Sequence, residues 1–494
     1  MMELGSVYDF LKGKAILVTG ATGFLAKIFV EKILRVQPNI KKLYLLLRAE
    51  NPHLATQRLH NEVFAKDLFS IQRDKWGEDF GSFVSEKVIA VAGDVSVENL
   101  GLKDLNLREE MLEEIDIIVH SAATTNFDER LDIAMGVNTM GALHVLNFAK
   151  TCFKVEILLH VSTAYVCGEV KGLIREEPLH IGHTLNGSSR LDINLEKQLI
   201  EEKLNELRLQ NASEQTITSV MKNFGILRAN LHGFPNAYVF TKAMGEMVLL
   251  NMKDDVPLII TRPTMVISTH SEPFPGWIEG VRTLDVVFVK YGKGTLRSFL
   301  GHPKTILDAI PADMVINSMI IALVAHSKRH SKTLIYHIGS SLRNPFRISD
   351  LEDIAHQYFT KNPLVDKYGK PVTVPKKIMW ISSMSYFNRY IKIRYVLPLM
   401  GLNVVNKVFW NCYGDVYNES QRKIKTLMNI ARFYKPYLLL EVIFDDKNAE
   451  KLRMATKPVA DETHGTFNFE PRSINWIDYM LNTHLPGLIK YSVK

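Results

Sequence analysis

The stretch "AILVTGATGFLAK", residues 15–27, restricts the possible folds of this chain more than any other part of its sequence. A short apolar run predicts a buried strand, Gly20 and Gly23 predict a tight turn, and an apolar pattern predicts a helix from about Phe24. With Ala26, the glycines give the spacing G-x-x-G-x-x-A, which brings the backbone and a helix N-terminus close to a pyrophosphate. We therefore expect a dinucleotide site; a purely structural turn is the alternative. The expected contacts come from Thr19, Gly20, Thr22, Gly23, Phe24 and Leu25.

The same alternation of apolar runs and helical patterns continues through the first 160 residues. Further strands are expected at "LYLLLR", "KVIAVAGD", "IDIIVHSA" and "EILLHVST", with helices near 55–71 and 137–150. Continuous apolar strands separated by helices indicate βαβ units and a parallel sheet covered on both faces. The predicted fold is α/β, a doubly wound Rossmann domain over residues 1–360, completed by a helix at 238–252 and the strands "PLIITRPT" and "TLIYHIG".

Two regions depart from this pattern. Residues 169–235 contain "RLDINLEKQLIEEKLNELRLQ", where leucines recur at helical spacing among charges. We interpret this segment as an inserted amphipathic helix that packs on the sheet domain. Residues 361–494 are predicted to form a mainly helical, basic and aromatic C-terminal domain. The apolar run "MVINSMIIALVAHS", which contains no charged residue, is too short for the roughly 20 residues of a membrane span.

Three charged residues bear on the identity of the dinucleotide. Arg48 ends the second strand, where a guanidinium suits the 2′-phosphate of NADPH, and Lys27 could assist. The alternative is that Arg48 is a solvated charge at a strand end. Asp94 follows the third strand, where a carboxylate can meet the adenine amino group or cap a turn. The sequence favours NADPH.

The chemical groups follow the fourth and fifth strands, whose carboxyl ends form the ligand edge of an open α/β sheet. Ser162 and Thr163 in "HVSTAYVCG" supply hydroxyls, and the next helix carries Tyr238 and Lys242 one turn apart. Carbonyl reduction by hydride needs a proton donor. A tyrosine serves if an ammonium stabilises its phenolate, while a hydroxyl holds the carbonyl oxygen. Alone, the Y-x-x-x-K pattern is common by chance; behind the glycine turn it predicts a catalytic site.

These residues resemble the extended short-chain dehydrogenases/reductases. The separation of Thr163 and Tyr238 is unusually long for that superfamily, and the insertion at 169–235 accounts for it. Together with "HVSTAYVCGE", "YVFTKAMGE", "RPTMVIST", "EPFPGWIEG" and "IPADMVIN", the insertion resembles the alcohol-forming fatty acyl-CoA reductases of plants. The end of the chain, "INWIDYMLNTHLPGL", is similar to the male-sterility-type domain of that family.

The resemblance implies a four-electron reduction of a long-chain fatty acyl-CoA to a primary alcohol, by two NADPH and through a thiohemiacetal and an aldehyde. Tyr238 would donate the proton, and Lys242 would bind the nicotinamide ribose and tune Tyr238. Thr163, with Ser162 beside it, would hold the carbonyl. Gly20, Gly23, Arg48 and Asp94 would bind NADPH. No metal is expected, and Asn138 would be structural.

Other residues near the expected site remain ambiguous. His120 replaces the asparagine often found in related sequences, and it either lines the nicotinamide pocket or fills space at a strand end. Phe274 and Trp277 in "EPFPGW" either line an acyl channel or pack in the core.

The C-terminal region carries most of the positive charge. Residues 367–435 contain 13 Lys/Arg and 2 Asp/Glu, in a chain of net charge +7. Basic residues interleaved with aromatics favour binding to an anionic membrane surface over nucleic acid, for which no motif is present. A solvated basic face is the plain alternative. Since the N-terminus resembles neither a secretory signal nor a plastid transit peptide, we expect peripheral attachment to the cytosolic face of the endoplasmic reticulum.

Other functions remain open: a reductase that stops at the aldehyde, a nucleotide-sugar epimerase or dehydratase, or a catalytically silent NADPH-binding membrane scaffold.

Overall fold

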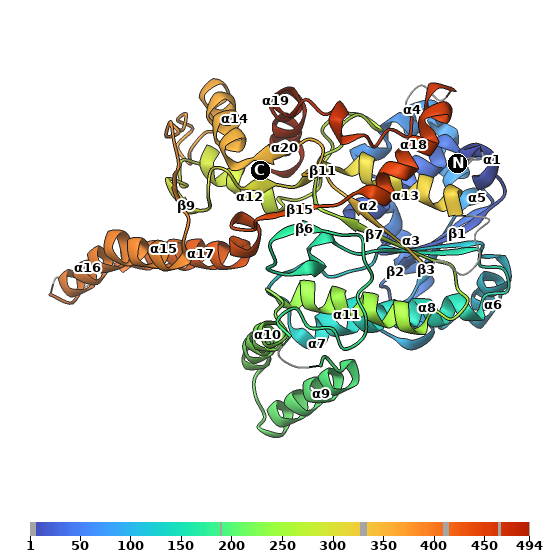
Figure 1. The fold of residues 1–494 in the computed structure, drawn as a ribbon, viewed down its shortest axis with the longest axis horizontal. Coiled ribbons are helices and arrows are strands. Elements are labelled where there is room, and N and C mark those ends of the chain that lie inside the picture. Colours follow the sequence, from blue (N-terminus) through green and yellow to red (C-terminus); the bar gives the residue numbers. More distant parts are fainter. Residues whose placement is uncertain (1–5, 188–189, 327–332, 409–413, 463–465, 494) are drawn as a thin grey trace.

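A parallel sheet of seven strands lies at the centre of the described structure (Figure 1). The computed structural model describes residues 6–187, 190–326, 333–408, 414–462 and 466–493. The strands lie in the order β12-β7-β5-β4-β1-β2-β3. Their bounds are β1 Ala15–Thr19, β2 Lys42–Leu47, β3 Val88–Ala92, β4 Ile117–His120, β5 Ile157–Val161, β7 Leu258–Pro263 and β12 Leu334–Ile338. The chain moves outward from β1 in one direction and then in the other, which confirms the doubly wound prediction.

Helices cover both faces of the sheet, because alternate residues of each strand point to opposite sides. In β1, Ile16 and Val18 belong to one hydrophobic cluster, and Ala15 and Leu17 belong to the other. In Figure 1, α2 (Phe24–Val36) and α13 (Ala312–His326) lie above the sheet, and α8 (Gly141–Thr151) and α11 (Ala237–Met252) lie below it. The expected helix near 137–150 is α8, preceded by a π-helical turn at Met135–Met140.

Further helices complete the sheet domain. In the first half these are α1 Val7–Leu11, α3 Pro52–Leu59, α4 Ser70–Trp76, α5 Phe80–Lys87, α6 Leu105–Glu114 and α7 Leu131–Ala134. After β7 come α12 Thr283–Gly292 and α14 Ile348–Lys361. Small two-stranded pairings involve β8 Met265–Ile267 with β11 Ala309–Pro311, β9 Ser298–Leu300 with β14 Met379–Ile381, and β10 Ile306–Leu307 with β13 Phe346–Arg347.

The inserted segment contains two long helices where the sequence predicted one. The expected helix is α9 (Ile193–Leu209), and α10 (Glu214–Leu231) follows it. α10 packs on α7 and α11, whereas α9 lies outside and contacts α7 and α10. The second helix was missed because small residues, including Gly225 and Ala229, occupy its buried face and weaken the apolar pattern.

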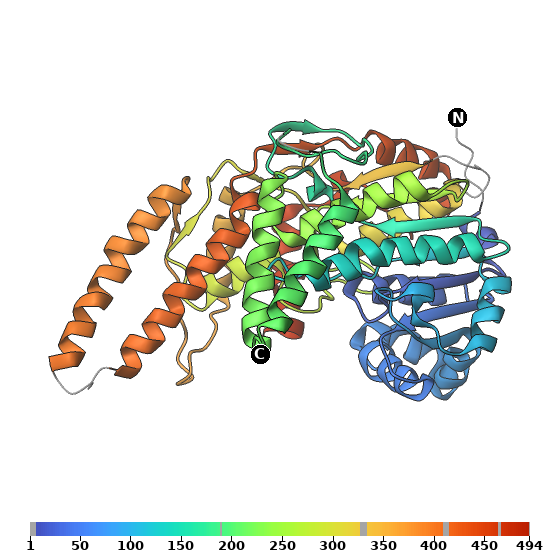
Figure 2. The same ribbon diagram turned by 90° about the horizontal axis from the view of Figure 1, so that it is seen from below.

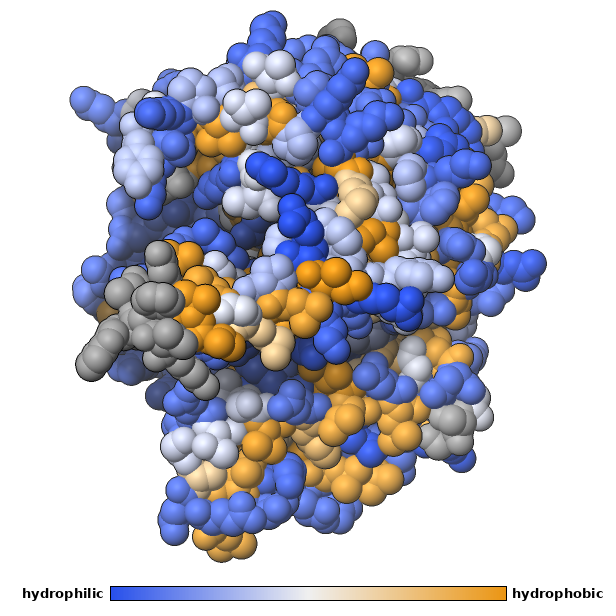
Figure 3. Space-filling model, turned by 90° about the vertical axis from the view of Figure 1, so that its left-hand side faces the viewer, coloured by the Kyte–Doolittle hydropathy of each residue, from blue (hydrophilic) through white to orange (hydrophobic). Residues whose placement is uncertain are grey.

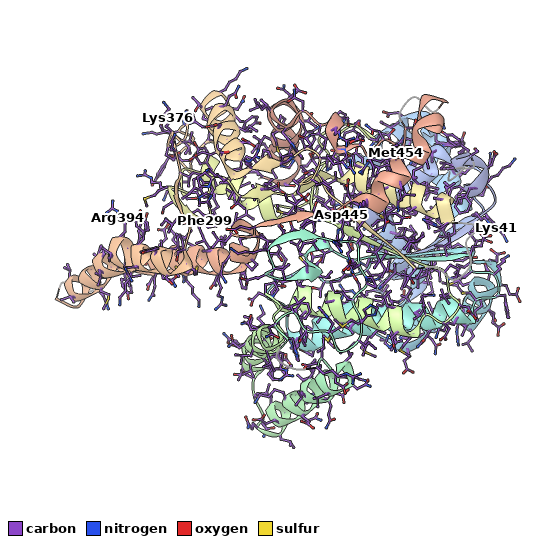
Figure 4. The ribbon with its side chains drawn as sticks, in the orientation of Figure 1. Lys41, Phe299, Lys376, Arg394, Asp445 and Met454 are labelled. Carbon is purple, nitrogen blue, oxygen red and sulfur yellow. The ribbon has the colours of Figure 1, made fainter. Side chains whose placement is uncertain are left out.

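The C-terminal region consists of a projecting part and a part that returns to the sheet domain. α15 (Met384–Ile391), a π-helical turn and α16 (Leu397–Val408) run antiparallel to α17 (Gly414–Leu438) and extend away from the body, as Figure 2 shows. We call residues 384–438 the arm. Figure 4 labels Arg394 on the arm and Asp445 at the point where the chain re-enters the body.

The returning segment is built into the sheet domain. β15 (Val442–Phe444) pairs in parallel with β6 (Gly172–Ile174), and α18 (Lys447–Glu462) packs on α13 and β12. α19 (Trp476–Tyr479) and α20 (Leu485–Ser492) follow, and the buried His484 lies 3.0 Å from Asp285 of α12. The region is mainly helical, as predicted, but residues 439–493 share a core with the Rossmann domain. Within the described residues, no helix is long and apolar enough to cross a membrane.

Candidate active site

The turn between β1 and α2 leaves a backbone cradle. Gly20 has a φ of +71°, and a Cβ added to it would lie 2.7 Å from the Cα of Ala122. Gly23 caps α2 without a side chain, and its N–H donates to the carbonyl of Gly20 over 2.8 Å. The first turn of α2 therefore directs its N–H groups toward an open turn, which fits the pyrophosphate of a dinucleotide.

Thr19 and His120 form a contact below this turn. Both side chains are buried, and Thr19 Oγ1 lies 2.8 Å from His120 Nδ1 and accepts from the N–H of Ala122 over 3.2 Å. The hydroxyl of Thr19 is thus committed to the end of β4, so an expected cofactor contact would have to come from its backbone. His120 joins β1 to β4 and does not line the cavity described below, which agrees with its packing alternative.

The beginning of α2 is covered by a loop that the sequence did not connect with it. Phe24 stacks on Trp277, with ring centroids 5.3 Å apart, and the Arg282 guanidinium lies 4.7 Å from the Phe24 ring centroid. Trp277 is buried, Phe274 is half-buried near Tyr491, and neither lines the cavity described below, so the alternative of an acyl channel is not supported. Leu25 and Phe24 line the cavity, and Thr22 is half-buried in the turn.

The three charged residues considered for NADPH lie in different surroundings. Arg48 directly follows β2 and its side chain is exposed. Lys27 is buried and its ammonium lies 2.6 Å from Glu279, so it holds the 279–283 loop. It is therefore not available to assist Arg48 at the 2′-phosphate of NADPH. Asp94 accepts from the N–H and hydroxyl of Ser96, which is the turn-capping role.

The predicted catalytic side chains converge at the carboxyl end of β5. Ser162 and Thr163 follow β5 and are buried, and the Tyr238 phenol of α11 hydrogen-bonds to the side chain of Thr163. Ser162 Oγ is buried and has no hydrogen-bond partner among the described residues. Burial raises the pKa of Tyr238 to about 12, although the bond to Thr163 acts in the opposite direction. A hydroxyl pair and a phenol thus face the same space.

Lys242 is fixed one turn further along α11. Its ammonium donates to the carbonyl of Val161 over 2.7 Å and lies 3.1 Å from His160 Nε2. Burial lowers the pKa of Lys242 to about 8, and the nearby Glu246 carboxylate acts in the opposite direction. Burial and the adjacent Lys242 charge also hold the pKa of His160 well below its usual range, which keeps the imidazole neutral.

Several polar contacts position α11. Asn236 caps the helix, because its side chain accepts from the N–H of Val239 over 2.9 Å. Asn138, on the π-helical turn, donates to Thr241 over 3.0 Å, in line with the structural role expected for it. Further along α11, Glu246 accepts from Arg262 of β7 over 3.0 Å in a buried ion pair.

One cavity of about 660 Å³ joins the glycine turn to the catalytic side chains. At the nucleotide end it is lined by Gly23, Phe24 and Leu25, and at the chemical end by Ser162, Thr163, Tyr238 and Lys242. The cavity continues to a wall that sequence reasoning did not identify. This wall consists of Phe127 and of Ile430, Phe433, Tyr434 and Tyr437 from α17. The signal was present in "IARFYKPY", where apolar residues recur every three or four positions, but the sequence does not show which surface α17 contacts.

The strand order, the glycine turn and the Ser-Thr-Tyr-Lys set define a reductase domain of the short-chain dehydrogenase/reductase type. Solved structures agree on the fold: a terminal reductase domain from the myxalamid pathway has a TM-score of 0.56, is 18% identical and covers 97% of this chain and 91% of its own. A reductase domain of a Mycobacterium tuberculosis nonribosomal peptide synthetase has a TM-score of 0.52, is 17% identical and covers 92% and 87% of the two chains.

Sequence comparison gives the family. Two family models, both described as male sterility protein, match residues 18–319 and 394–494. The chain is 53% identical to the alcohol-forming fatty acyl-CoA reductase of Simmondsia chinensis, covering 99% of each. It is 52% identical to fatty acyl-CoA reductase 1 of Arabidopsis thaliana, covering 98% of this chain and 99% of the relative. The chain belongs to the fatty acyl-CoA reductases of the male sterility family. Residues 18–319 match the part of that family that binds a nicotinamide cofactor.

Proposed function

We propose that this protein reduces long-chain fatty acyl-CoA to a primary alcohol with two NADPH. The observation that carries the proposal is the shared cavity, which the Tyr238 phenol and the glycine turn both line. The Tyr238 phenol is hydrogen-bonded to the side chain of Thr163. The names of the relatives support the acyl-CoA substrate. Long-chain specificity and alcohol formation rest on the family and are tested below.

The first half-reaction uses every member of the set. A reduced nicotinamide cofactor in this cavity supplies the hydride. Thr163 and the Ser162 hydroxyl, which has no partner among the described residues, hold the thioester oxygen. Tyr238 gives its proton to that oxygen as the carbonyl carbon is reduced. The Lys242 ammonium stabilises the resulting phenolate and binds the nicotinamide ribose. The product is a thiohemiacetal.

The same residues complete the reduction. The Tyr238 phenolate takes the proton back from the thiohemiacetal hydroxyl, the C–S bond breaks, and CoA leaves as a thiolate that takes a proton from solvent. The aldehyde carbonyl that forms lies where the thioester carbonyl lay. Tyr238 protonates this oxygen during a second hydride addition, and solvent restores the phenol. In total, one acyl-CoA, two reduced cofactors and two protons give one alcohol, one CoA and two oxidised cofactors.

Counting products tests this function. The protein is incubated with palmitoyl-CoA and NADPH, and NADPH oxidised, CoA released and extracted lipids are measured. We expect about two NADPH per CoA with hexadecanol as the product, as the balanced reaction above requires. One NADPH per CoA with accumulating aldehyde would identify an aldehyde-forming reductase.

Variants of two tyrosines complete this experiment. Tyr238→Phe should lower turnover by about 10²–10⁴, the usual contribution of a positioned proton donor. Tyr291→Phe is the control, because it also removes a buried phenol hydroxyl, which donates to the carbonyl of Pro375 away from the cavity. Absence of turnover in the wild type, with acyl-CoA and NADPH both supplied, would leave only a scaffold role.

We also infer that the arm binds an anionic membrane surface. Residues 384–438 contain nine Lys/Arg and two Asp/Glu. Exposed apolar side chains recur along α15, the π-helical turn and α16 at intervals of three, four and seven residues. These are Tyr386, Ile393, Leu397, Met400 and Val404. Figure 3 views the side on which the arm projects and shows hydrophobic side chains between hydrophilic ones. An apolar row within a basic helix pair suits a peripheral interface.

Vesicle flotation tests this membrane proposal. The protein should float with vesicles of phosphatidylcholine and phosphatidylserine, less at high salt, and less with phosphatidylcholine alone. Ile393→Ser with Met400→Ser should release it, whereas Leu209→Ser, an exposed leucine on α9, should not. Equal binding by all variants would contradict the proposal.

We also propose attachment to the cytosolic face of the endoplasmic reticulum. In that case the protein should be recovered with the microsome fraction, and protease added to intact microsomes should digest it.

A further inference from the structure

α17 is a single helix that extends from the arm into the active-site cavity. It begins at Gly414 and ends at Leu438, where the arm joins the body. Its last nine residues supply four of the five side chains of the cavity wall identified above, namely Ile430, Phe433, Tyr434 and Tyr437. The spacings of three and four residues place these four side chains on one face of the helix.

Aromatic contacts fix this wall relative to the catalytic helix. Tyr437 is buried and stacks on Phe127, with centroids 5.2 Å apart and an interplanar angle of 18°. Phe127 in turn lies 5.8 Å from the Tyr238 ring. The Asn236 amide, which caps the helix that carries Tyr238, donates to the Tyr437 hydroxyl over 3.4 Å. The inner end of α17 therefore has a defined position next to the proton donor.

The chemistry of the wall suits a hydrocarbon chain and not the phosphates of CoA. None of its four α17 side chains is charged. The charged residues that line the cavity come from other elements: Asp128, Lys242, Glu279 and Arg282. The basic residues of this part of α17 lie off the wall, since Arg432 is exposed and Lys435 is 3.1 Å from Glu169.

We propose that the inner face of α17 is the acyl-chain site, and that Ile430 and Phe433 determine which chain lengths react. The inference rests on the proposed function. With its carbonyl at Thr163 and Tyr238, the chain runs past Tyr437 and toward Ile430, in the direction of the arm. Seven residues of helix separate these two positions, which is about 10 Å along the axis. A short chain ends before Ile430, whereas a long chain packs against it.

Enlarging Ile430 tests the assignment by substrate length. Ile430→Trp should lower kcat/KM for palmitoyl-CoA at least about tenfold relative to octanoyl-CoA, since small changes of volume in an apolar pocket have effects of this size. Asn429→Trp is the matched control, because the same residue is placed on the exposed face of the same turn. An equal change for both substrates would overturn the proposal, provided that the wild type makes alcohol.

Photolabelling tests the same site independently of turnover. A palmitoyl-CoA with a diazirine at the chain terminus is bound in the presence of NADP⁺ and irradiated, and labelled peptides are mapped by mass spectrometry. We expect label on the peptide that contains Ile430 and Phe433, lost on competition with palmitoyl-CoA. Competed label elsewhere, with none on α17, would refute the acyl-chain site even if the enzyme makes alcohol. Label on α17 without any turnover would refute the proposed reductase function and leave the acyl-chain site in place.

Discussion

Lys242 differs from an ordinary lysine in that its ammonium is enclosed by protein. It donates to the Val161 carbonyl, contacts the neutral His160, and has Glu246 one turn away. Desolvation dominates these effects and lowers its pKa to about 8. The charge that the proposed mechanism requires is therefore lost within a pH range where the protein can be assayed.

We expect reduction of acyl-CoA to slow as the pH rises through about 8, because Lys242 then becomes neutral and no longer stabilises the Tyr238 phenolate. Tyr238 itself, with a pKa of about 12, stays protonated over this range. Initial rates measured at saturating cofactor would show this alkaline limb. In Lys242→Arg the limb should move to higher pH, at a lower overall rate, because a guanidinium keeps its charge. A wild-type profile that is flat to about pH 10 would contradict the role of Lys242.

Arg48 allows a separate test at the nucleotide end. If it contacts the 2′-phosphate, Arg48→Ala should raise KM for NADPH about ten- to hundredfold and leave KM for NADH nearly unchanged, as expected for one charge-assisted hydrogen bond. Lys12→Ala is a suitable control. This exposed lysine precedes β1, so it lies at the amino ends of the strands, whereas Arg48 lies at their carboxyl ends. If Arg48→Ala changed KM for NADPH no more than KM for NADH, Arg48 would be a solvated charge at a strand end.

At the residue scale, the sequence was most informative where chemistry requires fixed residue types. Ser162, Thr163, Tyr238 and Lys242 could be grouped because strand ends and one helical turn leave little freedom in where they point. Lys27 and Thr19 could not be assigned in this way. Their partners, Glu279 and His120, are more than 100 residues away, and no local pattern predicts such pairs.

At the element scale, α11 depends on its cap. Asn236 accepts from Val239 and donates to Tyr437, so it joins the catalytic helix to the acyl wall. Asn236→Ala should cost about 1 kcal/mol of unfolding free energy and also lower kcat, because Tyr238 lies in the first turn. Ser213→Ala removes the cap of α10, with a similar cost in stability. It should leave kcat unchanged. Denaturant unfolding and steady-state rates measured on the same samples would separate the two effects.

The elements themselves were predicted unevenly. Apolar strands followed by patterned helices identified the sheet, because both kinds of segment have a simple periodicity. α10 was missed because its buried face uses small residues, and α17 was interpreted only by its charge. The sequence could not show that the two ends of α17 have different surroundings, since that depends on how the arm joins the body.

At the scale of the whole molecule, the described part of residues 439–493 contributes side chains to the main core. Leu452, Phe467, Phe469 and Trp476 are buried, and β15 pairs with β6. We therefore expect residues 1–360 expressed alone to be insoluble or to unfold without a cooperative transition, because α13 and β12 would lose the cover of α18. Thermal unfolding and limited proteolysis would test this. A stable, cooperatively folding 1–360 fragment would instead support two separate domains with a boundary near 360.

The cavity has its nucleotide end and its acyl wall on different elements, and this arrangement bears on processivity. Two reduced cofactors are needed for each acyl group, so the spent one must be exchanged while an aldehyde is present. The nucleotide end is lined by the 279–283 loop, held by the Lys27–Glu279 pair, whereas the acyl wall is on α17. Opening the loop need not disturb α17, so we expect the aldehyde to stay bound during the exchange and little of it to escape into solution.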